Sequence, residues 1–359
     1  MKSAGGLRAR FPTRPEPALS GVPFRWALAA GVFVVVATLL GLALGPVDLG
    51  IVGVVREVLS HVPFLGVDSS FSDTEDAILW ELRAPRVVLG LLVGAMLASA
   101  GAGYQGVFRN PLADPYLLGA AAGAGLGATL VIAYDLGGDG GLDLRPPAAF
   151  VGAMLGVALA YLLGRSVGGR QTATLILAGV TVASFLTAVQ TFVQQRSAET
   201  VQEVYSWILG QLETSGWTDV LIVLPYAIGS AVALLVHRRL LDVLAVGDDE
   251  AASLGIPVAR VRLLVVAAAT LGTAAAVAFS GLIAFVGIIV PHAVRLMAGA
   301  SYRVVLPLSL AFGAGFLVLM DLVSRTAVAP AQLPIGVVTA FLGAPFFAVV
   351  LRTTRTVGP

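Results

Sequence analysis

Arginine side chains at two places in this sequence have the chemistry to bind carboxylates. Arg83 and Arg86 occur together in the segment Leu82–Arg86, and Arg325 ends an apolar run much later in the chain. A guanidinium group presents a planar set of N–H donors that matches a carboxylate in a bidentate pair. Arginines at helix ends also extend their charged groups towards the water beside a membrane. These residues alone leave two interpretations open: a basic socket for an acidic partner, or interfacial arginines.

A second polar set lies within the apolar run Thr172–Val193 and just after it. Its members recur at spacings of three and four residues, so they share one face of a helix. They are Thr181, Ser184, Thr187, Gln190, Thr191 and Gln194. Polar groups in a membrane span need hydrogen-bond partners or water. Hydrogen bonds between helices would satisfy them, but we favour an uncharged, water-filled path for a large hydrophilic solute.

The acidic segment Leu244–Pro257 is predicted to form a short amphipathic helix. Acidic residues in its first turn suit the helix dipole, Gly255 stands where a C-terminal cap belongs, and Pro257 prevents continuation. The residues concerned are Gly247, Asp248, Asp249, Glu250, Ala251, Leu254 and Gly255. A helix of two turns is not stable alone. We therefore expect it to dock on this protein or on a cytosolic one.

The segment Arg109–Pro115 is a polar elbow between two long apolar runs. Asn110-Pro111 and Asp114-Pro115 each disfavour helical geometry at the residue before proline, so the elbow must interrupt the helices on either side. A charged connector of fixed shape indicates a working part, because a plain turn needs no such chemistry. A rigid connector that only sets the angle between helices is the alternative.

The elements that must position these residues are membrane spans. The chain is 57% hydrophobic and only 12% charged, whereas soluble domains carry about 25% charged residues. Apolar runs near the ~20 residues needed to cross a bilayer recur along its length. We predict an all-α polytopic membrane protein with about ten spans: Trp26–Leu44, Val87–Val107, Tyr116–Tyr134, Ala148–Leu163, Thr172–Val193, Val220–Val236, Val261–Phe279, Leu282–Met297, Val304–Val323 and Gly336–Leu351.

Basic residues predict the orientation of these spans. With a cytoplasmic N-terminus, most of the 22 basic residues fall in cytoplasmic segments, as the positive-inside rule requires. We therefore expect both termini in the cytoplasm, with residues 1–24 and 353–359 as tails and residues 25–352 as one membrane domain. Residues 242–257 then form a cytoplasmic loop. Arg83, Arg86 and Arg325 lie on the outer side.

Several classes of mechanism do not fit this composition. Lys2 is the only lysine, so a phosphate-binding Gly-x-x-x-x-Gly-Lys-Ser/Thr loop is absent and the chain cannot be a P-loop ATPase. Ionisable residues within the spans are almost missing, which disfavours both ion-coupled transport and membrane hydrolases. No metal site is predicted, because cysteine is absent and no cluster of ligands lies along a path. An ion-coupled secondary transporter, a membrane enzyme and a permease for free metal ions remain as alternatives.

Four ordered motifs resemble the FecCD family of permease subunits from bacterial ABC importers, which take up iron–siderophores, haem and cobalamin. They are Arg109–Gly119, Val246–Gly255, Phe285–Arg295 and the run from Leu333 to Phe346. The resemblance covers about Leu82 to Leu351. It implies the ten-helix fold of type II ABC importers, in the cell inner membrane. It also implies a second copy of the chain, two cytosolic ATPase subunits that carry ATP and Mg²⁺, and an extracytoplasmic binding protein. No cofactor on this chain, no enzyme activity and no nucleic-acid partner are implied.

The resemblance also assigns roles to individual residues. The segment from Gly247 to Gly255 would be the coupling helix in the ATPase groove, and Arg83, Arg86 and Arg325 would receive acidic residues of the binding protein. Asn110, Leu112 and Thr172 fall where the family places its cytoplasmic gate. Thr187, Gln190, Thr191 and Gln194 remain our candidates for the path, while His292 and Arg295 are interpreted as structural. The sequence departs from the family at Gln332, where an acid is usual.

Overall fold

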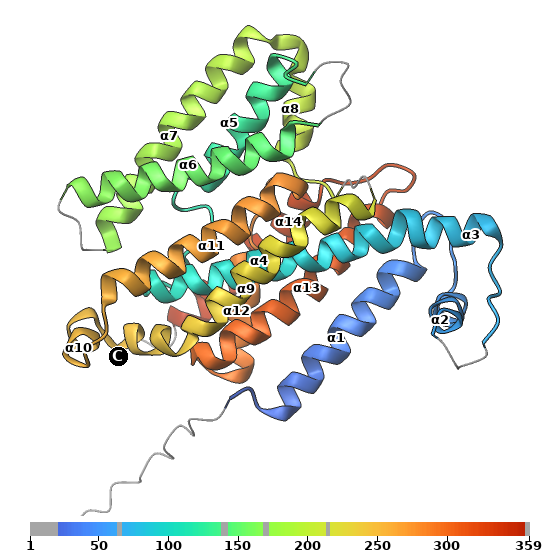
Figure 1. The fold of residues 1–359 in the computed structure, drawn as a ribbon, viewed down its shortest axis with the longest axis horizontal. Helices are drawn as coiled ribbons and strands as arrows, with labels where there is room; N and C mark the ends of the chain where they lie inside the picture. Colours follow the sequence, from blue (N-terminus) through green and yellow to red (C-terminus); the bar gives the residue numbers. More distant parts are fainter. Residues whose placement is uncertain (1–20, 63–66, 138–142, 168–171, 213–215, 356–359) are drawn as a thin grey trace, which may run out of the picture.

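The computed structural model describes residues 21–62, 67–137, 143–167, 172–212 and 216–355, and in these ranges the regular structure is helical (Figure 1). Seven helices are long and apolar enough to cross a membrane, and three shorter apolar helices accompany them. Together they correspond to the ten predicted runs. The prediction of an all-α polytopic membrane protein is confirmed.

Among the described residues the apolar helices are α1 (Phe24–Ala43), α4 (Ala84–Phe108), α5 (Ala120–Ala133), α6 (Arg145–Ser166), α7 (Thr172–Arg196), α9 (Trp217–Val246), α11 (Val258–Ser280), α12 (Val286–Ala298), α13 (Tyr302–Thr326) and α14 (Ile335–Arg355), of which α5, α12 and α14 (apolar over Ile335–Val350) are the shorter ones. Short elements connect them: α2 (Ile51–Ser60), α3 (Asp73–Ala77), the π-helical turn η1 (Ile78–Arg83), the 3₁₀ turn η3 (Ala198–Thr200), α8 (Val201–Ile208) and α10 (Asp248–Ser253).

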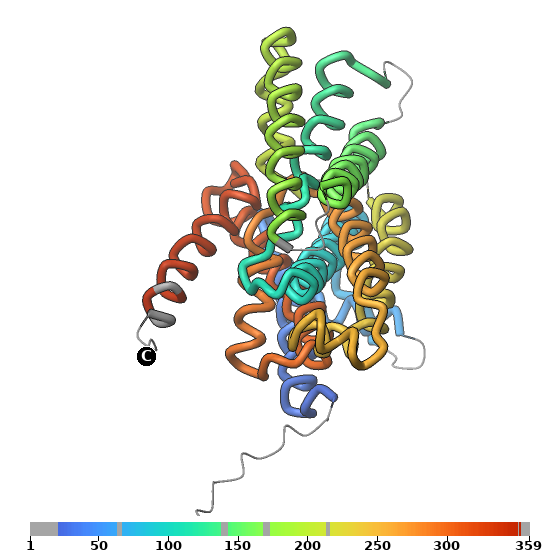
Figure 2. The backbone as a smooth tube through the Cα atoms, turned by 90° about the vertical axis from the view of Figure 1, so that its left-hand side faces the viewer, coloured from blue at the N-terminus to red at the C-terminus, as the bar shows by residue number. Residues whose placement is uncertain are grey.

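The helices form two groups. In the larger group α4, α11 and α13 are buried along most of their length, and α1 and α9 lie at its margin (Figure 1). Helices α5, α6 and α7 form the second group, which packs on the first through α6 and α11. The last helix, α14, extends away from the bundle (Figure 2). Helix α10 and the end of α14 lie at one end of the molecule, and α2 and α3 at the other.

Glycine explains how closely the helices approach. Two stripes of small residues, Gly90-x-x-x-Gly94 and Gly119-x-x-x-Gly123-x-x-x-Gly127, lie at helix contacts. A Cβ atom added at Gly94 would lie 2.2 Å from the carbonyl oxygen of Gly313, and one at Gly123 would lie 2.1 Å from that of Gly152. No side chain fits at such distances, so these stripes let backbones pack directly, as in other membrane helices.

Several helix boundaries differ from the sequence prediction, and two of these differences affect the candidate functional segments. Helix α5 begins only at Ala120, because Asp114, Tyr116 and their neighbours form turns before it. Helix α9 continues to Val246, so residues 242–246 of the predicted cytoplasmic loop are helical. The short helices α2 and α8 were not predicted, since each is only about half the length of a span.

Candidate functional site

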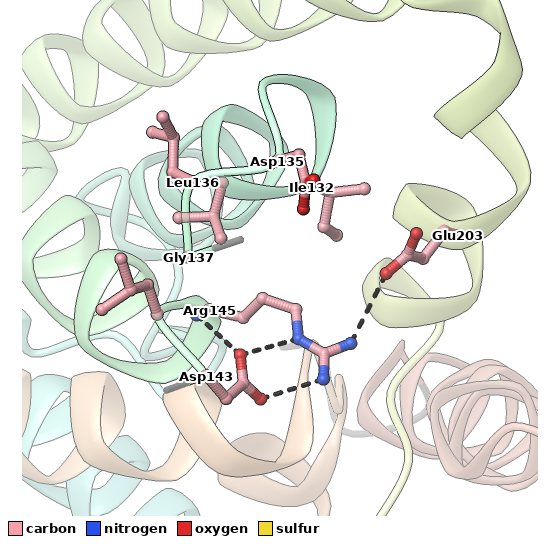
Figure 3. A pocket seen from close by; sticks show the side chains of 9 residues that line it. Ile132, Asp135, Leu136, Gly137, Asp143, Arg145 and Glu203 are labelled. Atoms are coloured by element: carbon pink, nitrogen blue, oxygen red, sulfur yellow. Dashed lines mark hydrogen bonds and ion pairs between the residues drawn. The ribbon is translucent and has the colours of Figure 1, made fainter. Parts of the chain in front are cut away.

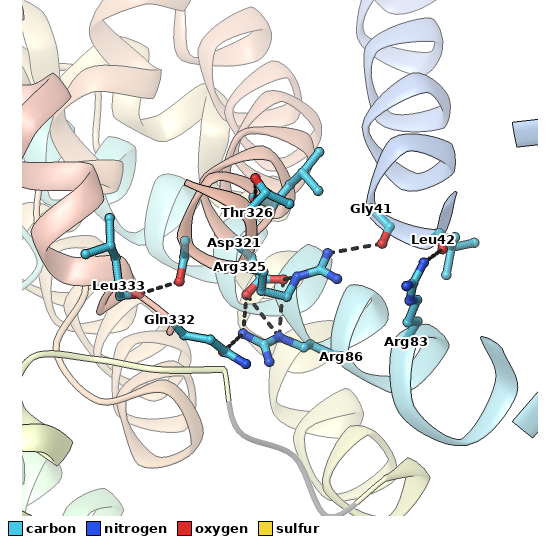
Figure 4. Close-up of polar contacts among 11 residues, drawn as sticks. Gly41, Leu42, Arg83, Arg86, Asp321, Arg325, Thr326, Gln332 and Leu333 are labelled. Carbon is cyan, nitrogen blue, oxygen red and sulfur yellow. Dashed lines mark hydrogen bonds and ion pairs between the residues drawn. The ribbon is translucent and has the colours of Figure 1, made fainter. Parts of the chain in front are cut away.

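Arg86 and Arg325 meet at one buried carboxylate, that of Asp321 (Figure 4). The Arg86 Nη2 and Nε atoms donate to Asp321 Oδ1 at 2.8 and 3.0 Å. Arg325, one turn further along α13, places its Nε 2.9 Å from Asp321 Oδ2. Asp321 is 1% exposed. A buried charge needs partners of opposite sign, and these two arginines supply them from α4 and α13.

Arg83 and Arg325 also bind the C-terminal end of α1. Arg83 Nη1 donates to the carbonyl oxygens of Leu42 and Ala43 at 2.8 and 2.9 Å. Arg325 Nη2 donates to the carbonyl of Gly41 at 3.1 Å. The last carbonyls of a helix lack partners within the helix, and the negative end of its dipole attracts cations. The two arginines therefore cap α1 and attach it to α4 and α13.

These contacts leave the three predicted docking residues in different positions. Arg83 and Arg325 are buried, at 6% and 5% exposure, and their donors point towards α1 and Asp321. Arg86 is partly exposed, and its Nη2 also donates to Oε1 of the exposed Gln332 at 3.0 Å. Gln332, where the family usually has an acid, thus contacts the arginine nearest the surface. Docking through these residues stays a prediction, and Arg86 is its most accessible member.

The Arg109–Pro115 elbow has a fixed shape made by its own hydrogen bonds. Arg109 ends α4 in the left-handed region, at φ 49°. Asn110 Oδ1 accepts from the N–H of Leu112 at 2.9 Å, and Asp114 Oδ1 accepts from that of Tyr116 at 2.8 Å. Each asparagine or aspartate before proline therefore forms an Asx turn. The predicted helix interruption is confirmed.

The environment of Asp114 differs from that of an exposed carboxylate. Burial raises the pKa of Asp114 to about 6, and the hydrogen bond from the Tyr116 backbone opposes this shift. Tyr116 in turn donates its hydroxyl to the carbonyl of Ile283 at 3.1 Å and so joins the elbow to the segment before α12. Of the predicted gate residues, Asn110 is half-buried and Leu112 is 46% exposed. Thr172 begins α7, and its side chain lies outside the described residues.

Helix α10 confirms the predicted amphipathic helix in the acidic segment. Gly255 adopts φ +78°, its N–H bonds to the carbonyl of Ala252 at 2.9 Å, and the N–H of Ile256 bonds to that of Ala251 at 3.1 Å. This pair of bonds is the Schellman cap that glycine favours. Ala251 is fully buried against the protein, whereas Leu254 is 71% exposed.

The outward side of α10 is both acidic and apolar. Asp249 and Glu250 are exposed there, and the apolar side chains of Val246 and Leu254 are 72% and 71% exposed beside them. Gly247 separates α9 from α10. The short helix thus docks on this chain through the buried side chain of Ala251 and the paired carboxylate of Asp248, and it leaves Asp249, Glu250 and Leu254 exposed.

Asp248 connects α10 to the elbow. Its carboxylate accepts from Arg262 Nη2 on α11 at 2.9 Å and lies 3.6 Å from Arg109 Nη2. The acidic helix and the elbow therefore lie at the same end of the molecule, in contact through one ion pair. Sequence reasoning missed this link, because Arg109 and Asp248 are far apart in the chain and no spacing connects them.

The polar set on α7 does not stay together. Thr187 and Thr191 are exposed, and the Thr191 hydroxyl donates to the carbonyl of Thr187 at 2.9 Å. Gln194 is half-buried. Gln190 is only 8% exposed, and a Cβ atom at Gly125 of α5 would lie 2.9 Å from its Oε1. Within one chain, Gln190 therefore faces α5, while the threonines point outward.

A polar cavity of about 240 Å³ lies where α5 ends and α6 begins (Figure 3). Arg145 projects into it and donates to both carboxylate oxygens of Asp143 at 2.8 and 2.9 Å. The Nη1 atom of Arg145 lies 3.6 Å from Oε1 of Glu203 on α8. The arginine is thus already paired with two acids, and the cavity offers it no role in binding an anion. Elsewhere, the described residues contain no group of three or more His, Asp or Glu side chains placed to hold a metal ion.

Comparison with known proteins decides the family. The FecCD transport family matches residues 33–353. The chain belongs to this family. The match includes the elbow, α10 and all three arginines, and it extends further towards the N-terminus than the sequence motifs did.

FecCD relatives transport several solutes. The chain is 40% identical over 322 residues to the uncharacterized ABC transporter permease protein YvrB of Bacillus subtilis, covering 89% of this chain and 91% of the relative. It is 43% identical to the cobalamin import system permease protein BtuC of Halobacterium salinarum, covering 78% and 74%. It is 37% identical to the hemin transport system permease protein HmuU of Yersinia pestis, covering 77% and 84%.

A solved structure shares the FecCD fold seen here. It is described as an inward-facing conformation of a metal-chelate type ABC transporter, and it superimposes with a TM-score of 0.79 at 28% identity. The superposition covers 92% of this chain and 99% of the other. The two chains therefore share the arrangement of helices over most of this chain. Arg86, Asp321 and Arg325 lie within the part that matches the FecCD family.

Proposed function

We propose that this chain is the permease subunit of an ATP-driven importer that moves an iron chelate, haem or cobalamin across the inner membrane of a bacterial cell. The observation that carries the proposal is that α10 and the Arg109–Pro115 elbow lie side by side at one end of the molecule. There α10 contacts the gate elbow through Asp248 and Arg109, while its outward side with Asp249, Glu250 and Leu254 stays exposed. A short helix that presents its free surface at a gate suits the transfer of motion from another subunit.

The assembly we propose contains two copies of the chain, two cytosolic ATPase subunits and an extracytoplasmic binding protein. ATP and Mg²⁺ belong to the ATPase subunits, and no chemical step occurs on this chain. The distribution of arginines supports cytoplasmic termini. Exposed apolar side chains along α14, such as Phe341 at 76% and Val349 at 61% exposure, suit contact with lipid or with the second copy.

The path in this proposal runs along the outward side of α7. Thr187 and Thr191 offer hydroxyl groups without charge, which suits a large hydrophilic chelate that must pass without being held. Gln194 lies beside them, half-buried. Gln190 supports this side through its contact with α5. Asn110, Leu112 and Thr172 form the cytoplasmic gate, with Leu112 as the exposed apolar member.

ATP-dependent uptake tests the proposal directly. Liposomes that contain this chain with its cognate ATPase and binding protein should accumulate at least one of three labelled solutes: a ferric siderophore, haem or cobalamin. The accumulation should require ATP on the side of the membrane that carries the ATPase subunits. It should persist when ion gradients across the membrane are dissipated. Uptake without the ATPase, abolished by dissipating the gradient, would identify a secondary transporter instead.

Docking of the binding protein has its own test at Arg86. Replacing Arg86 with alanine should weaken binding of the binding protein about tenfold or more, because a charge-assisted pair at an interface contributes roughly 1.5–3 kcal/mol. Titration of the binding protein onto the purified permease measures this affinity. Arg145→Ala is the matched control, since Arg145 also lies on the outer side but is paired with Asp143 and Glu203. Equal affinities for Arg86→Ala and the unmodified chain would refute docking at this arginine.

A further inference from the structure

Helix α2 is amphipathic, but its apolar side faces away from the protein, whereas the apolar side of a helix on a soluble protein faces the core. Its acidic residue Glu57 faces the protein, and most of its apolar residues face outward. The outward apolar side chains share one stripe, with exposed fractions from 36% to 73%; they are Ile51, Val52, Val58, Leu59 and, just after the helix, Val62. Stripes of this kind normally pack into a core. Here, among the described residues, no part of the chain covers it.

The inward side of α2 holds a buried acid. Glu57 is 1% exposed and accepts a hydrogen bond from the Ser69 hydroxyl. The ring Nδ1 of His61 lies 3.3 Å from the Glu57 carboxylate, and the His61 ring packs on Trp80 with centroids 5.1 Å apart. These contacts fix the rotation of α2 about its axis, because turning the stripe inward would expose Glu57 and break each of them.

The position of α2 is fixed at the level where α1 ends. Val54 packs with Leu49, Ala43 and Leu79 in a small separate core. The N–H of Leu49 bonds to the carbonyl of Ala43, the last residue of α1, at 3.2 Å. Figure 1 shows α2 end-on while α1 lies across the view, so the two axes are strongly inclined. A helix that is inclined to a span and lies at the level of the end of that span has the position expected of a helix at the membrane surface.

The surface of α1 indicates what covers the stripe. Beyond Arg25 at its start, the exposed residues of α1 are apolar, including Val32 at 54% and Val35 at 57% exposure, as expected of a span that faces lipid. Val47, in the segment that connects α1 to α2, is an exposed apolar residue as well, at 47% exposure. The stripe itself carries no charge, and the exposed Arg56 lies at its edge, where an arginine can reach lipid phosphate.

We propose that α2 is an interfacial helix, with its apolar stripe inserted at the boundary between lipid headgroups and acyl chains. It would hold the end of α1 at a fixed depth. The depth of this end matters to the contacts of Arg83 and Arg325, because the carbonyl groups that these two arginines cap belong to it. The inference concerns lipid and is independent of which solute the permease carries.

Site-directed spin labelling tests this proposal, since the chain contains no native cysteine. Single variants Val52→Cys, Val35→Cys and Asp73→Cys would be labelled in the full chain and placed in phosphatidylcholine–phosphatidylglycerol nanodiscs. Oxygen concentrates in lipid and a nickel chelate stays in water. Val35 on α1 is the lipid reference, and Asp73, exposed on α3, is the water reference.

The label at Val52 should resemble that at Val35, with relaxation enhanced several-fold more by oxygen than by nickel. A label at Val52 that relaxes like the one at Asp73 would overturn the proposal. Adding the binding protein distinguishes the remaining occupant. If the Val52 label responds to nickel in the free permease and is shielded only after the binding protein is added, the stripe is a protein-docking surface and the lipid proposal is wrong.

Discussion

Replacing Asp321 with alanine is expected to lower the free energy of unfolding by about 3–5 kcal/mol, since it leaves buried charges without a partner. Arg86 and Arg325 both depend on this one carboxylate, which is 1% exposed. The loss extends beyond α13, because Arg325 also holds the end of α1 through Gly41. Thermal unfolding in detergent, followed by tryptophan fluorescence, measures the effect.

Two further variants separate this explanation from a general effect of removing an acid. Glu203→Ala removes an exposed carboxylate that lies 3.6 Å from Arg145, and its cost should stay below about 1 kcal/mol. Adding Arg86→Met to Asp321→Ala should recover part of the lost stability, because it removes one of the unpaired charges. Equal stability of Asp321→Ala and the unmodified chain would mean that both arginines already reach water.

The fold could be predicted from the sequence because its signals are local. A run of apolar residues reports a span wherever it lies, and the prolines after Asn110 and Asp114 act on the residue next to them. The cap at Gly255 is equally local: a glycine in the left-handed region that ends a short helix. The structure contains each of these features as predicted and shows where each lies in the bundle.

The polar contacts between helices could not be predicted, because each of them depends on segments far apart in the chain. Arg86 and Asp321 are brought together by the packing of α4 on α13, and the sequence around either residue does not indicate the other as its partner. The spacing of Asp321 and Arg325 by one helical turn was the available signal. Helical spacing groups Gln190 with the threonines, whereas its side chain lies against Gly125 of α5; its place in the path stays a prediction.

Introducing a charge at Leu254 is expected to abolish coupling to the ATPase while leaving the permease folded. Leu254 is 71% exposed, so Leu254→Asp removes little buried surface within the chain. Burying a leucine at an interface contributes roughly 1.5–3 kcal/mol, so the affinity for the ATPase subunit should fall about tenfold to a hundredfold. Titration of the cognate ATPase and ATP-dependent uptake in liposomes measure the two consequences.

The matched control for Leu254→Asp is the same substitution at Leu82, which is 64% exposed at the opposite end of the molecule. Leu82→Asp should keep the affinity for the ATPase, because η1 lies beside α3 and far from α10. If both variants bound the ATPase as the unmodified chain does, α10 would not be the coupling helix. If both lost binding equally, the charge would act through the stability of the bundle. Loss confined to Leu254→Asp locates the ATPase on the exposed side of α10, next to the ion pair that joins Asp248 to the elbow.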